Sequence, residues 1–244
     1  MADRAALITG GSSGIGLAIA RALGREGYGL TVSARRPEKL EEAVKGLVDE
    51  GFDAHAVPAN MTAEEDIVAL RDAHRERYGR LDVLVNNAGV GIGGAIADHE
   101  TKKLDMQLGA NLRGVYLMLR EAIPLLKEAG SEHGKALVVN VASIAGKHGQ
   151  GWLGAYSATK AAVVGLSQAA HGELSKEGIQ VTAFCPAFVA TAMTDWVEGQ
   201  VPKEDMIRPE DIGEAVLFLL RTSPNCIVPE IQFVRPGDSP GAGV

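Results

Sequence analysis

The sequence predicts an α/β protein, a doubly wound domain in which about seven parallel strands carry helices on both faces. The first observation is that short apolar or β-branched runs alternate with longer helical patterns along all 244 residues. The second is that a glycine-rich turn joins the first apolar run to the first helical pattern. No Pro/Ser-rich linker and no internal repeat divide the chain. We therefore expect one domain over residues 1–244, ending in a flexible Gly/Pro-rich tail at 235–244.

The expected strands are short runs rich in Val, Ile, Leu and Ala, the composition of strands buried on both faces. In chain order they are 5–9, 28–34, 53–59, 81–87, 135–143, 179–186 and 230–234.

The expected helices lie between these strands and have apolar residues at helical spacing. In chain order they are 14–26, 37–51, 63–79, about 101–129, 156–176 and 209–221. Pro37 favours a helix start, and Thr62 is the predicted cap of the third helix. Pro124 falls inside the fourth pattern, so we expect this helix to kink or to end early.

The composition excludes several classes of function. The net charge is −7 and the Lys and Arg residues are scattered, so no basic surface for nucleic acid or an anionic membrane is expected. No apolar run reaches the length of a membrane span, and "MADRAALITG" is not a secretory signal. Cys185 and Cys226 are predicted to be reduced thiols, and the six dispersed histidines predict no metal site. These features are typical of a cytoplasmic protein.

The segment "ALITGGSSGIG" places Gly10, Gly14 and Gly16 between the first strand and the first helix. Glycines allow a tight turn and a close approach of the backbone to a diphosphate, whose charge is stabilised by the free N–H groups at the helix start. Ser12 and Ser13 add hydroxyl donors. A tight turn without a ligand remains the alternative, but the position between strand and helix favours a dinucleotide site.

The end of the second strand distinguishes NADP from NAD. A carboxylate there would bind the adenosine ribose of NAD, but the sequence continues "SARRP". Arg35 and Arg36 instead offer two guanidinium groups that suit a 2′-phosphate. The alternative is that both are solvated residues at a helix start. We expect NADP (NADPH), with NAD less favoured.

Four further segments contain polar residues that bear on function. "NNAG" follows the fourth strand, "ANLRGVY" contains Asn111, "NVASIAG" contains Ser143, and "YSATK" contains Tyr156 and Lys160. Together with "TGGSSGIG", this set resembles the short-chain dehydrogenase/reductase family over nearly the whole chain. The resemblance implies a Rossmann-like fold and an NADP(H)-dependent oxidoreductase that interconverts a carbonyl and an alcohol by hydride transfer.

The resemblance also implies the catalytic roles. Tyr156 would be the general acid/base, and Lys160 would bind the nicotinamide ribose and hold positive charge near the phenol. Ser143 would hold the substrate oxygen, and Asn111 would bind a water in a proton relay through Lys160. Because Tyr156 and Lys160 are four residues apart, they share one helix face. A nearby ammonium, and the positive nicotinamide when oxidised, are expected to stabilise the phenolate and so lower the pKa of the phenol.

The resemblance extends the predicted cofactor site to other segments. Its members, besides the glycines, serines and arginines above, are Ile15, Asn60, Met61, Asn87, Ala88, Gly89, Tyr156, Lys160, Pro186, Val189 and Thr191. Three positions depart from the family pattern. Asn60 replaces the usual acid near adenine, Ala187 replaces a glycine after Pro186, and "RPGD" lacks paired glycines near the end. The last departure puts C-terminal subunit contacts in doubt.

The remaining expectations concern substrate and partners. By resemblance, the pocket is lined by residues after "NNAG", by residues after Ser143, including His148 and Trp152, and by 188–206, a mobile lid with apolar contacts. An uncharged carbonyl or alcohol fits such a pocket. Small residues after Tyr156 predict a homodimer or homotetramer. The alternative function is a catalytically idle NADP-binding sensor or scaffold, which the intact Asn, Ser, Tyr and Lys set disfavours.

Overall fold

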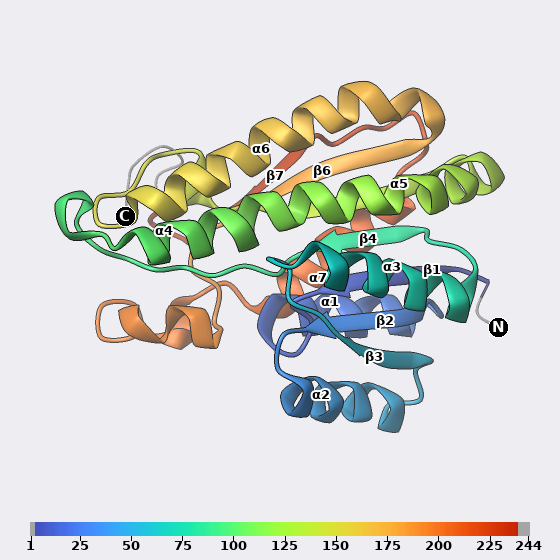
Figure 1. The fold of residues 1–244 in the computed structure, drawn as a ribbon, viewed down its shortest axis with the longest axis horizontal. Coiled ribbons are helices and arrows are strands. Elements are labelled where there is room, and N and C mark those ends of the chain that lie inside the picture. Colours follow the sequence, from blue (N-terminus) through green and yellow to red (C-terminus); the bar gives the residue numbers. More distant parts are fainter. Residues whose placement is uncertain (1–2, 239–244) are drawn as a thin grey trace.

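The computed structural model describes residues 3–238 and contains one sheet with helices on both sides (Figure 1). The sheet has seven strands in the order β3-β2-β1-β4-β5-β6-β7, and every neighbouring pair is parallel. The strands are β1 Ala5–Thr9, β2 Gly29–Ala34, β3 Ala54–Pro58, β4 Val83–Asn86, β5 Ala136–Val141, β6 Ile179–Pro186 and β7 Glu230–Phe233. The predicted fold class is confirmed.

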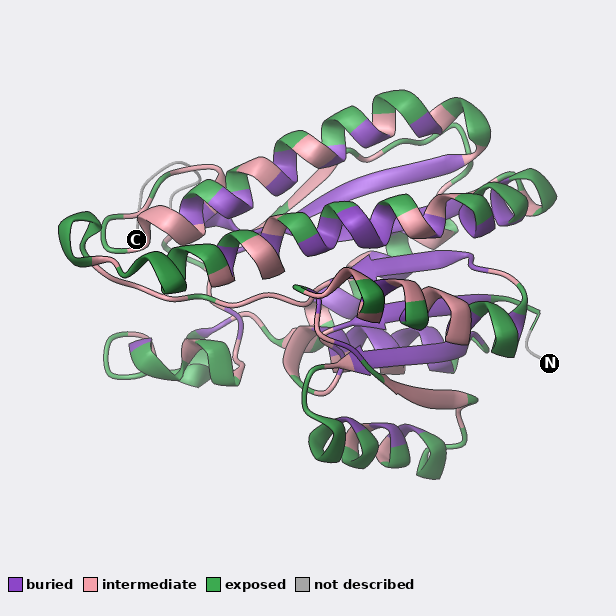
Figure 2. Cartoon of the chain, viewed as in Figure 1, coloured by how far each residue is buried: buried purple, intermediate pink, exposed green. Residues whose placement is uncertain are grey.

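Side-chain alternation along the strands divides the apolar interior into two layers. Ala6 and Ile8 of β1 belong to one cluster, together with side chains from α1 Gly14–Arg25, α2 Pro37–Asp49 and α7 Pro209–Arg221. Leu7 points to the other face, where α3 Glu64–Tyr78, α5 Gly114–His133 and α6 Gly154–Leu174 contribute. Since successive residues of a strand face opposite sides, a five-residue apolar run supports helices on both faces. Figure 2 shows the central strands buried between these layers.

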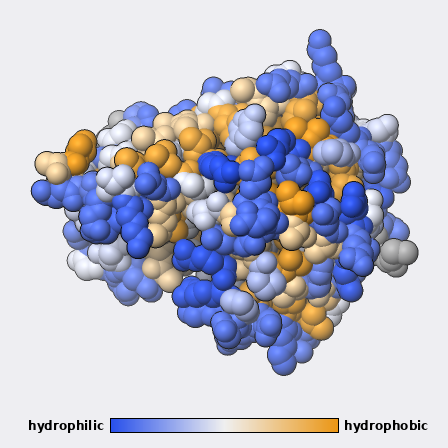
Figure 3. Space-filling model, in the orientation of Figure 1, coloured by the Kyte–Doolittle hydropathy of each residue, from blue (hydrophilic) through white to orange (hydrophobic). Residues whose placement is uncertain are grey.

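The outer surface is predominantly polar. In Figure 3, hydrophilic side chains cover most of the visible face, and hydrophobic ones lie between them. Charged pairs join neighbouring helices on this surface, for example Glu64 of α3 with Arg113 and Arg120, both at 2.7 Å. Such exposed pairs contribute about 0–1 kcal/mol each, so they add little to the stability of the fold.

The fourth helical pattern differs from the prediction. It forms α4 Thr101–Leu108, a π-helical turn Gly109–Arg113, and α5, which continues through Pro124 to His133. Pro124 cannot donate to the Arg120 carbonyl, but both residues are exposed, so water can satisfy that oxygen. Leu125 and Leu126 are buried and hold the helix on the sheet. The predicted early end at Pro124 was therefore wrong, and the irregular turn lies around Asn111 instead.

The predicted cap at Thr62 was also wrong. The helix α3 starts after Ala63, which makes no side-chain cap. Instead, the Thr62 hydroxyl donates to Asn60 Oδ1 (3.0 Å), and Asp66 Oδ2 accepts from the Asn60 N–H (2.8 Å). A carboxylate in the first turn thus replaces the expected hydroxyl in ordering this end of the helix.

The predicted flexible tail, 235–244, lies partly outside the described residues. Within 235–238 the chain makes a turn, in which the Arg235 guanidinium donates to Asp238 (2.7 Å) and lies over the ring of Phe188 (5.6 Å). Residues 239–244 fall outside the described range.

Candidate active site

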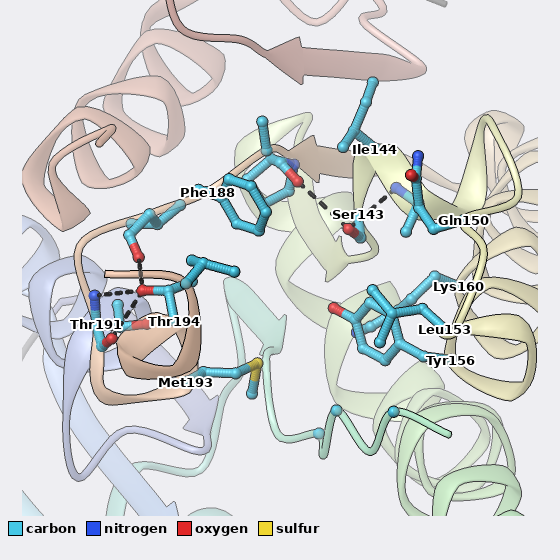
Figure 4. Close-up of a pocket in the computed structure, with 18 of the residues that line it drawn as sticks. Ser143, Ile144, Gln150, Leu153, Tyr156, Lys160, Phe188, Thr191, Met193 and Thr194 are labelled. Atoms are coloured by element: carbon cyan, nitrogen blue, oxygen red, sulfur yellow. Dashed lines mark hydrogen bonds between the residues drawn. The ribbon is translucent and has the colours of Figure 1, made fainter. Parts of the chain in front are cut away.

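The candidate site lies at the carboxyl edge of the sheet, where the strand order reverses between β1 and β4. Such a switch point leaves a crevice for ligands in open parallel sheets. A cleft of about 590 Å³ lies there, and Figure 4 shows it. Residues after β4, β5 and β6 and the first two turns of α6 line it. Ser143, Tyr156 and Lys160, predicted from separate motifs, all belong to this lining.

The glycine loop has the backbone that a diphosphate site requires. Gly10 and Gly14 have φ of +65° and +52°, a region that side chains disfavour. Ser13 is the N-cap of α1, its hydroxyl makes no capping bond, and no acid occupies the first turn. The N–H groups of this turn are therefore available to an anion. Ile15, in the same turn, lines the cleft, so the loop and the cleft are continuous. These features fit a dinucleotide.

Thr9, which the sequence analysis did not select, positions the glycine loop. Its Oγ1 accepts from the N–H groups of Asn87 and Ala88, both at 3.1 Å. In return, Asn87 Nδ2 donates to the carbonyls of Thr9 (3.1 Å) and Gly10 (3.0 Å). The "NNAG" segment after β4 is thus fixed against the loop after β1. A polar residue ending an otherwise apolar strand was the available signal.

Arg35 and Arg36 leave the sheet beside the glycine loop. The Gly11 N–H donates to the carbonyl of Ser33 (3.0 Å), two residues before Arg35. Both arginines are exposed, and Arg36 is the N-cap of α2. The carboxyl end of β2 therefore carries two solvent-facing guanidinium groups and no carboxylate at the positions predicted to contact the adenosine ribose.

Asn60 and Met61, which are predicted to contact adenine, follow β3 and differ in how far their side chains are buried. Asn60 is half-buried, and its Oδ1 already accepts from the N–H (3.2 Å) and hydroxyl of Thr62. Its amide N–H groups remain as donors. Met61 is 8% exposed, and its side chain packs in the apolar layer of α3 and α5. The Met61 side chain is therefore part of the core, and a contact of this residue with adenine stays a prediction.

Ser143 lies two residues after the strand β5, as the N-cap of a 3-10 turn, and faces Tyr156 across the cleft. Its Oγ accepts from the Ala145 N–H (3.2 Å) and donates to the Pro186 carbonyl (3.4 Å). Figure 4 shows the Tyr156 hydroxyl pointing into the cavity on the side of Ser143. Burial raises the pKa of the Tyr156 phenol, and the hydroxyl of Ser143 partly opposes this. In this structure, the phenol is therefore protonated near neutral pH.

Lys160 lies beneath the cleft and is 5% exposed. Its Nζ donates to the Val141 carbonyl (2.7 Å) and lies 5.7 Å from the centre of the Tyr156 ring. Burial lowers the pKa of this ammonium to about 8. Desolvation of the phenol is the largest effect on the pKa of Tyr156, so the expected lowering by the ammonium is not confirmed, and the contribution of an oxidised nicotinamide stays a prediction.

Asn111 sits in the π-helical turn and is fully buried. Its Oδ1 accepts from the Val90 N–H (2.8 Å), and its Nδ2 donates to the Val90 carbonyl (2.9 Å) and to Thr159 Oγ1 (3.1 Å). Thr159 in turn donates to the Tyr156 carbonyl (2.8 Å). Both amide protons are thus engaged, and the side chain fixes the segment after β4 to the first turn of α6. Single π-helical turns often mark functional sites.

A network of two further buried amides, missed in the sequence, supports the same region. Asn86 Nδ2 donates to Asn140 Oδ1 (2.9 Å), and Asn140 Nδ2 donates to Ser167 Oγ (2.9 Å). These residues come from β4, β5 and α6, so the network connects the strands that end at the cleft with the helix of Tyr156. Polar residues inside predicted apolar strands were the signal.

The segment after β6 forms the remaining wall. Pro186, Val189 and Thr191, which are predicted to contact the nicotinamide carboxamide, line the cleft. Thr191 also reaches the glycine loop, since a Cβ on Gly14 would lie 2.8 Å from Thr191 Cγ2. Asn87 and Gly89 line the cleft as well. The other predicted cofactor residues, namely Gly10, Ser12, Ser13, Gly14, Gly16, Arg35, Arg36, Asn60, Met61 and Ala88, follow β1 to β4 outside it.

A family model described as short chain dehydrogenase matches residues 4–201. The chain belongs to the short-chain dehydrogenase family. A Streptomyces coelicolor protein provisionally named a ketoacyl reductase is 37% identical, over 88% of this chain and 89% of the relative. The crystal structure of an actinorhodin polyketide ketoreductase variant with NADPH matches with a TM-score of 0.85 and 35% identity, covering 96% and 97% of the two chains. The crystal structure of the 3-ketoacyl-(acyl-carrier-protein) reductase from Brucella melitensis with NADH matches with a TM-score of 0.87 and 31% identity. The match covers 97% of this chain and 98% of the other.

The family membership makes this chain an oxidoreductase with a nicotinamide cofactor. One solved neighbour holds NADPH and another NADH, so the choice between them rests on this chain's own residues. Within residues 3–238 no helix is long and apolar enough to cross a membrane, and no cluster of His, Cys, Asp or Glu has the arrangement of a metal site.

The substrate side of this short-chain dehydrogenase is largely apolar. The predicted lid, 188–206, includes a 3-10 segment at Ala192–Val197 and is tied back by a bridge between Val189 and Ile207. Its Met193 and Trp196 line the cleft opposite Trp152, whereas His148 does not line it. The lid therefore makes the apolar contacts that the sequence predicts.

Proposed function

We propose that this short-chain dehydrogenase is an NADP(H)-dependent oxidoreductase that interconverts a carbonyl and an alcohol, with Tyr156 as general acid/base. The observation that carries the proposal is that Ser143, Tyr156 and Lys160 line one cleft beside the open N-terminus of α1. Separate strands and a helix bring them there, and the cleft offers a substrate oxygen positions near the Ser143 and Tyr156 hydroxyls.

The residues divide the chemistry as follows. The bound nicotinamide supplies or accepts the hydride. Ser143 holds the substrate oxygen in place with its hydroxyl. Tyr156 donates its proton to that oxygen during reduction, or removes the proton during oxidation. Since burial keeps the phenol protonated, proton donation needs no prior change of its state. Oxidation requires the phenolate, which positive charge near the ring would stabilise.

Lys160 and Asn111 position this unit. The bond from Lys160 Nζ to the Val141 carbonyl fixes the ammonium below the Tyr156 ring and leaves two N–H bonds for the cofactor ribose or a water. Asn111, with both amide protons engaged, acts through Thr159 on the backbone of Tyr156. A relay water would therefore bind to another group of the π-helical turn, not to the amide protons of Asn111.

The preference for NADP rests on Arg35 and Arg36. Two exposed guanidinium groups at the carboxyl end of β2 can form bidentate bonds to a 2′-phosphate. NAD lacks this phosphate, and the segment Ala34–Pro37 offers no carboxylate for its ribose. The exposure of both side chains is what a ligand-facing position requires, and it also suits a solvated helix start.

A catalytically idle NADP-binding sensor or scaffold is the alternative function. It would need the cofactor loop but would place no demand on the alignment of Ser143, Tyr156 and Lys160. The hydrogen bonds that hold the Tyr156 backbone and the Lys160 ammonium in place favour the enzyme.

Self-association is proposed from the outer faces of α4 to α6. A groove between these helices is lined by Leu108, Leu112, Tyr116 and Leu166 among others. Beside it, α6 exposes small residues at helical spacing, Ala158, Ala161, Gly165 and Ala169. Small exposed residues permit close helix packing, so we propose a homodimer or homotetramer. Sedimentation velocity tests this proposal, and a monomer at micromolar concentration contradicts it.

The Tyr156→Phe variant tests the central proposal. It removes only the hydroxyl, so we expect the loss of at least two orders of magnitude in kcat for carbonyl reduction. NADPH affinity, measured by fluorescence titration, should change less than threefold. The conservative Ser143→Thr variant, which keeps a hydroxyl, should retain more activity than Ser143→Ala. Undiminished turnover in Tyr156→Phe would refute the mechanism.

A panel of carbonyls and alcohols, followed by NADPH absorbance, separates the two functions. Turnover of any carbonyl that depends on Tyr156 supports the enzyme. Tight NADPH binding with no turnover across the panel favours the sensor.

A further inference from the structure

The four-residue pattern Arg-Pro-x-Asp occurs twice in the chain, as "RPED" at 208–211 and "RPGD" at 235–238. In each copy the guanidinium donates to both oxygens of the aspartate three residues on, with the shorter bond at 2.7 Å. The surroundings differ. The side chain of Arg208, the N-cap of α7, is 75% exposed, whereas that of Arg235 is 14% exposed. The turn itself therefore does not require a buried arginine.

Arg235 is buried against Phe188. Its guanidinium carbon lies 5.6 Å from the centre of the Phe188 ring, within the range of about 6 Å in which a ring attracts a cation. Phe188 lines the cleft (Figure 4) and meets Trp196 of the lid edge-on at 6.2 Å. Arg235 is not among the described residues that line the cleft. Its contact with the substrate side therefore passes through the ring of Phe188.

The backbone around Phe188 is held without Arg235. The Ala187 N–H donates to the Phe233 carbonyl (2.8 Å), and the Ile207 N–H donates to the Phe188 carbonyl (3.0 Å). Removing the Arg235 side chain would leave these bonds in place and would free only the ring of Phe188. The cofactor residues predicted in the same segment would keep their backbone positions, so the effect would be confined to the substrate side.

The charge of Arg235 is already engaged. Asp238 accepts from its Nε (3.0 Å) and from its Nη2 (2.7 Å). These bonds are the main reason that the pKa of Arg235 is raised, and the carboxylate of Asp205 in the lid contributes in the same direction. Two carboxylates thus act on one guanidinium. An anionic group on the substrate would have to displace Asp238 to pair with it, so direct binding of the substrate is disfavoured.

We propose that Arg235, held by Asp238, is a positioning residue that keeps the Phe188 ring against the cleft and thereby sets the affinity for the carbonyl substrate. Without it, binding would have to order a mobile aromatic side chain, at a cost in affinity. This inference rests on the proposed function and adds a residue to its substrate side.

Steady-state kinetics tests the proposal with two aryl ketones that differ in charge, neutral methyl 4-acetylbenzoate and anionic 4-acetylbenzoate. We expect Arg235→Ala to raise KM for both ketones about fivefold, the cost of ordering one side chain, and to leave kcat unchanged. NADPH affinity should also stay unchanged. Asp238→Ala, which removes the support of the guanidinium, should raise KM in the same direction. Arg208→Ala, in the other copy of the motif, is the matched control and should change no value.

A double-mutant cycle shows whether Arg235 acts through Phe188. In a Phe188→Ala background, Arg235→Ala should produce no further rise in KM, because the ring that it holds is gone. Arg235→Lys keeps a cation over the ring but loses the two-bond fork to Asp238, so its KM should lie between those of wild type and Arg235→Ala.

Direct binding of an anionic substrate predicts a different pattern. Arg235→Ala would then raise KM for 4-acetylbenzoate alone, and Asp238→Ala would lower it by freeing the guanidinium. That pattern overturns the positioning role. So does an equal rise in KM with and without the Phe188 ring, or a fall in kcat at constant KM.

Acrylamide quenching of tryptophan emission separates this inference from the proposed function, because it needs neither substrate nor cofactor. Trp196, one of the two tryptophans of the chain, contacts Phe188. Freeing this ring should raise quenching in Arg235→Ala and Asp238→Ala, and not in Arg208→Ala. Raised quenching with no turnover of any ketone supports the positioning of Phe188 and contradicts the proposed catalysis. Unchanged quenching overturns the inference, while turnover still supports the enzyme.

Discussion

Replacing His74 tests how burial controls the stability of this fold. His74 of α3 is fully buried, and its Nε2 lies 2.8 Å from the Arg80 carbonyl. A carbonyl only accepts, so Nε2 carries the proton and Nδ1 accepts from the Thr31 hydroxyl (2.7 Å). The Thr31 oxygen in turn accepts from His55 Nε2 (2.6 Å). The network requires a neutral His74, and burial lowers its pKa from 6.5 to about 4.

The magnitude and sign follow from this difference in pKa. As pH falls from about 6.5 to about 4, the unfolded chain takes up a proton at His74 and the folded chain does not. The folded state therefore loses about 3 kcal/mol relative to the unfolded state over this interval, and the loss is complete at about pH 4. His55, whose pKa burial also lowers, adds a loss of the same sign.

The His74→Gln variant isolates the contribution of His74. A glutamine amide can donate to the Arg80 carbonyl and accept from Thr31, but it does not titrate. Urea unfolding between about pH 7 and pH 4 should show that the variant's loss of unfolding free energy is about 3 kcal/mol smaller than that of the wild type. His148→Gln, on the loop after β5, serves as the matched control. Equal pH dependence in His74→Gln and wild type would refute the reasoning.

Three further predictions concern the cofactor loop and a helix end. Arg35→Ala should lower kcat/KM for NADPH about tenfold or more and leave kcat/KM for NADH nearly unchanged. The control Arg25→Ala, at the far end of α1, should change neither value. Steady-state kinetics with both cofactors measures these effects. Thr9→Val leaves the N–H groups of Asn87 and Ala88 without their acceptor. It should therefore weaken NADPH binding about tenfold in a titration, and Thr9→Ser should restore it; equal binding in both variants contradicts the positioning role. Lys135→Met removes an ammonium that donates to the carbonyl and hydroxyl of Thr222, both at 2.9 Å, at the end of α7. It should lower the unfolding free energy by about 1–3 kcal/mol in urea without altering NADPH affinity.

The sequence by itself determined the elements and the chemical groups of the site. Each expected strand appears, and segments such as 5–9 and 179–186, which are mostly apolar, are buried along their whole length, as expected for strands between two layers of helices. Gly10 and Gly14 indicated a tight turn between strand and helix, and both adopt the positive φ that glycine permits. The motif set that contains Ser143, Tyr156 and Lys160 predicted one shared site through its resemblance to a known family, and the three side chains line one cleft. These features depend on local periodicity or on a specific set of motifs.

Only the tertiary structure decided the features that depend on long-range contacts. The side-chain role of Asn111 follows from Val90, twenty-one residues away. The raised pKa of Tyr156 follows from the groups that exclude water from it, which no spacing along the chain reports. The rings of Trp152 and Trp196 lie together because the loop after β5, which packs on Gly93, meets the lid. Burial and long-range contact are properties of the folded chain. The residue types of the site were therefore predictable from the sequence, whereas their pKa shifts and hydrogen-bond partners were not.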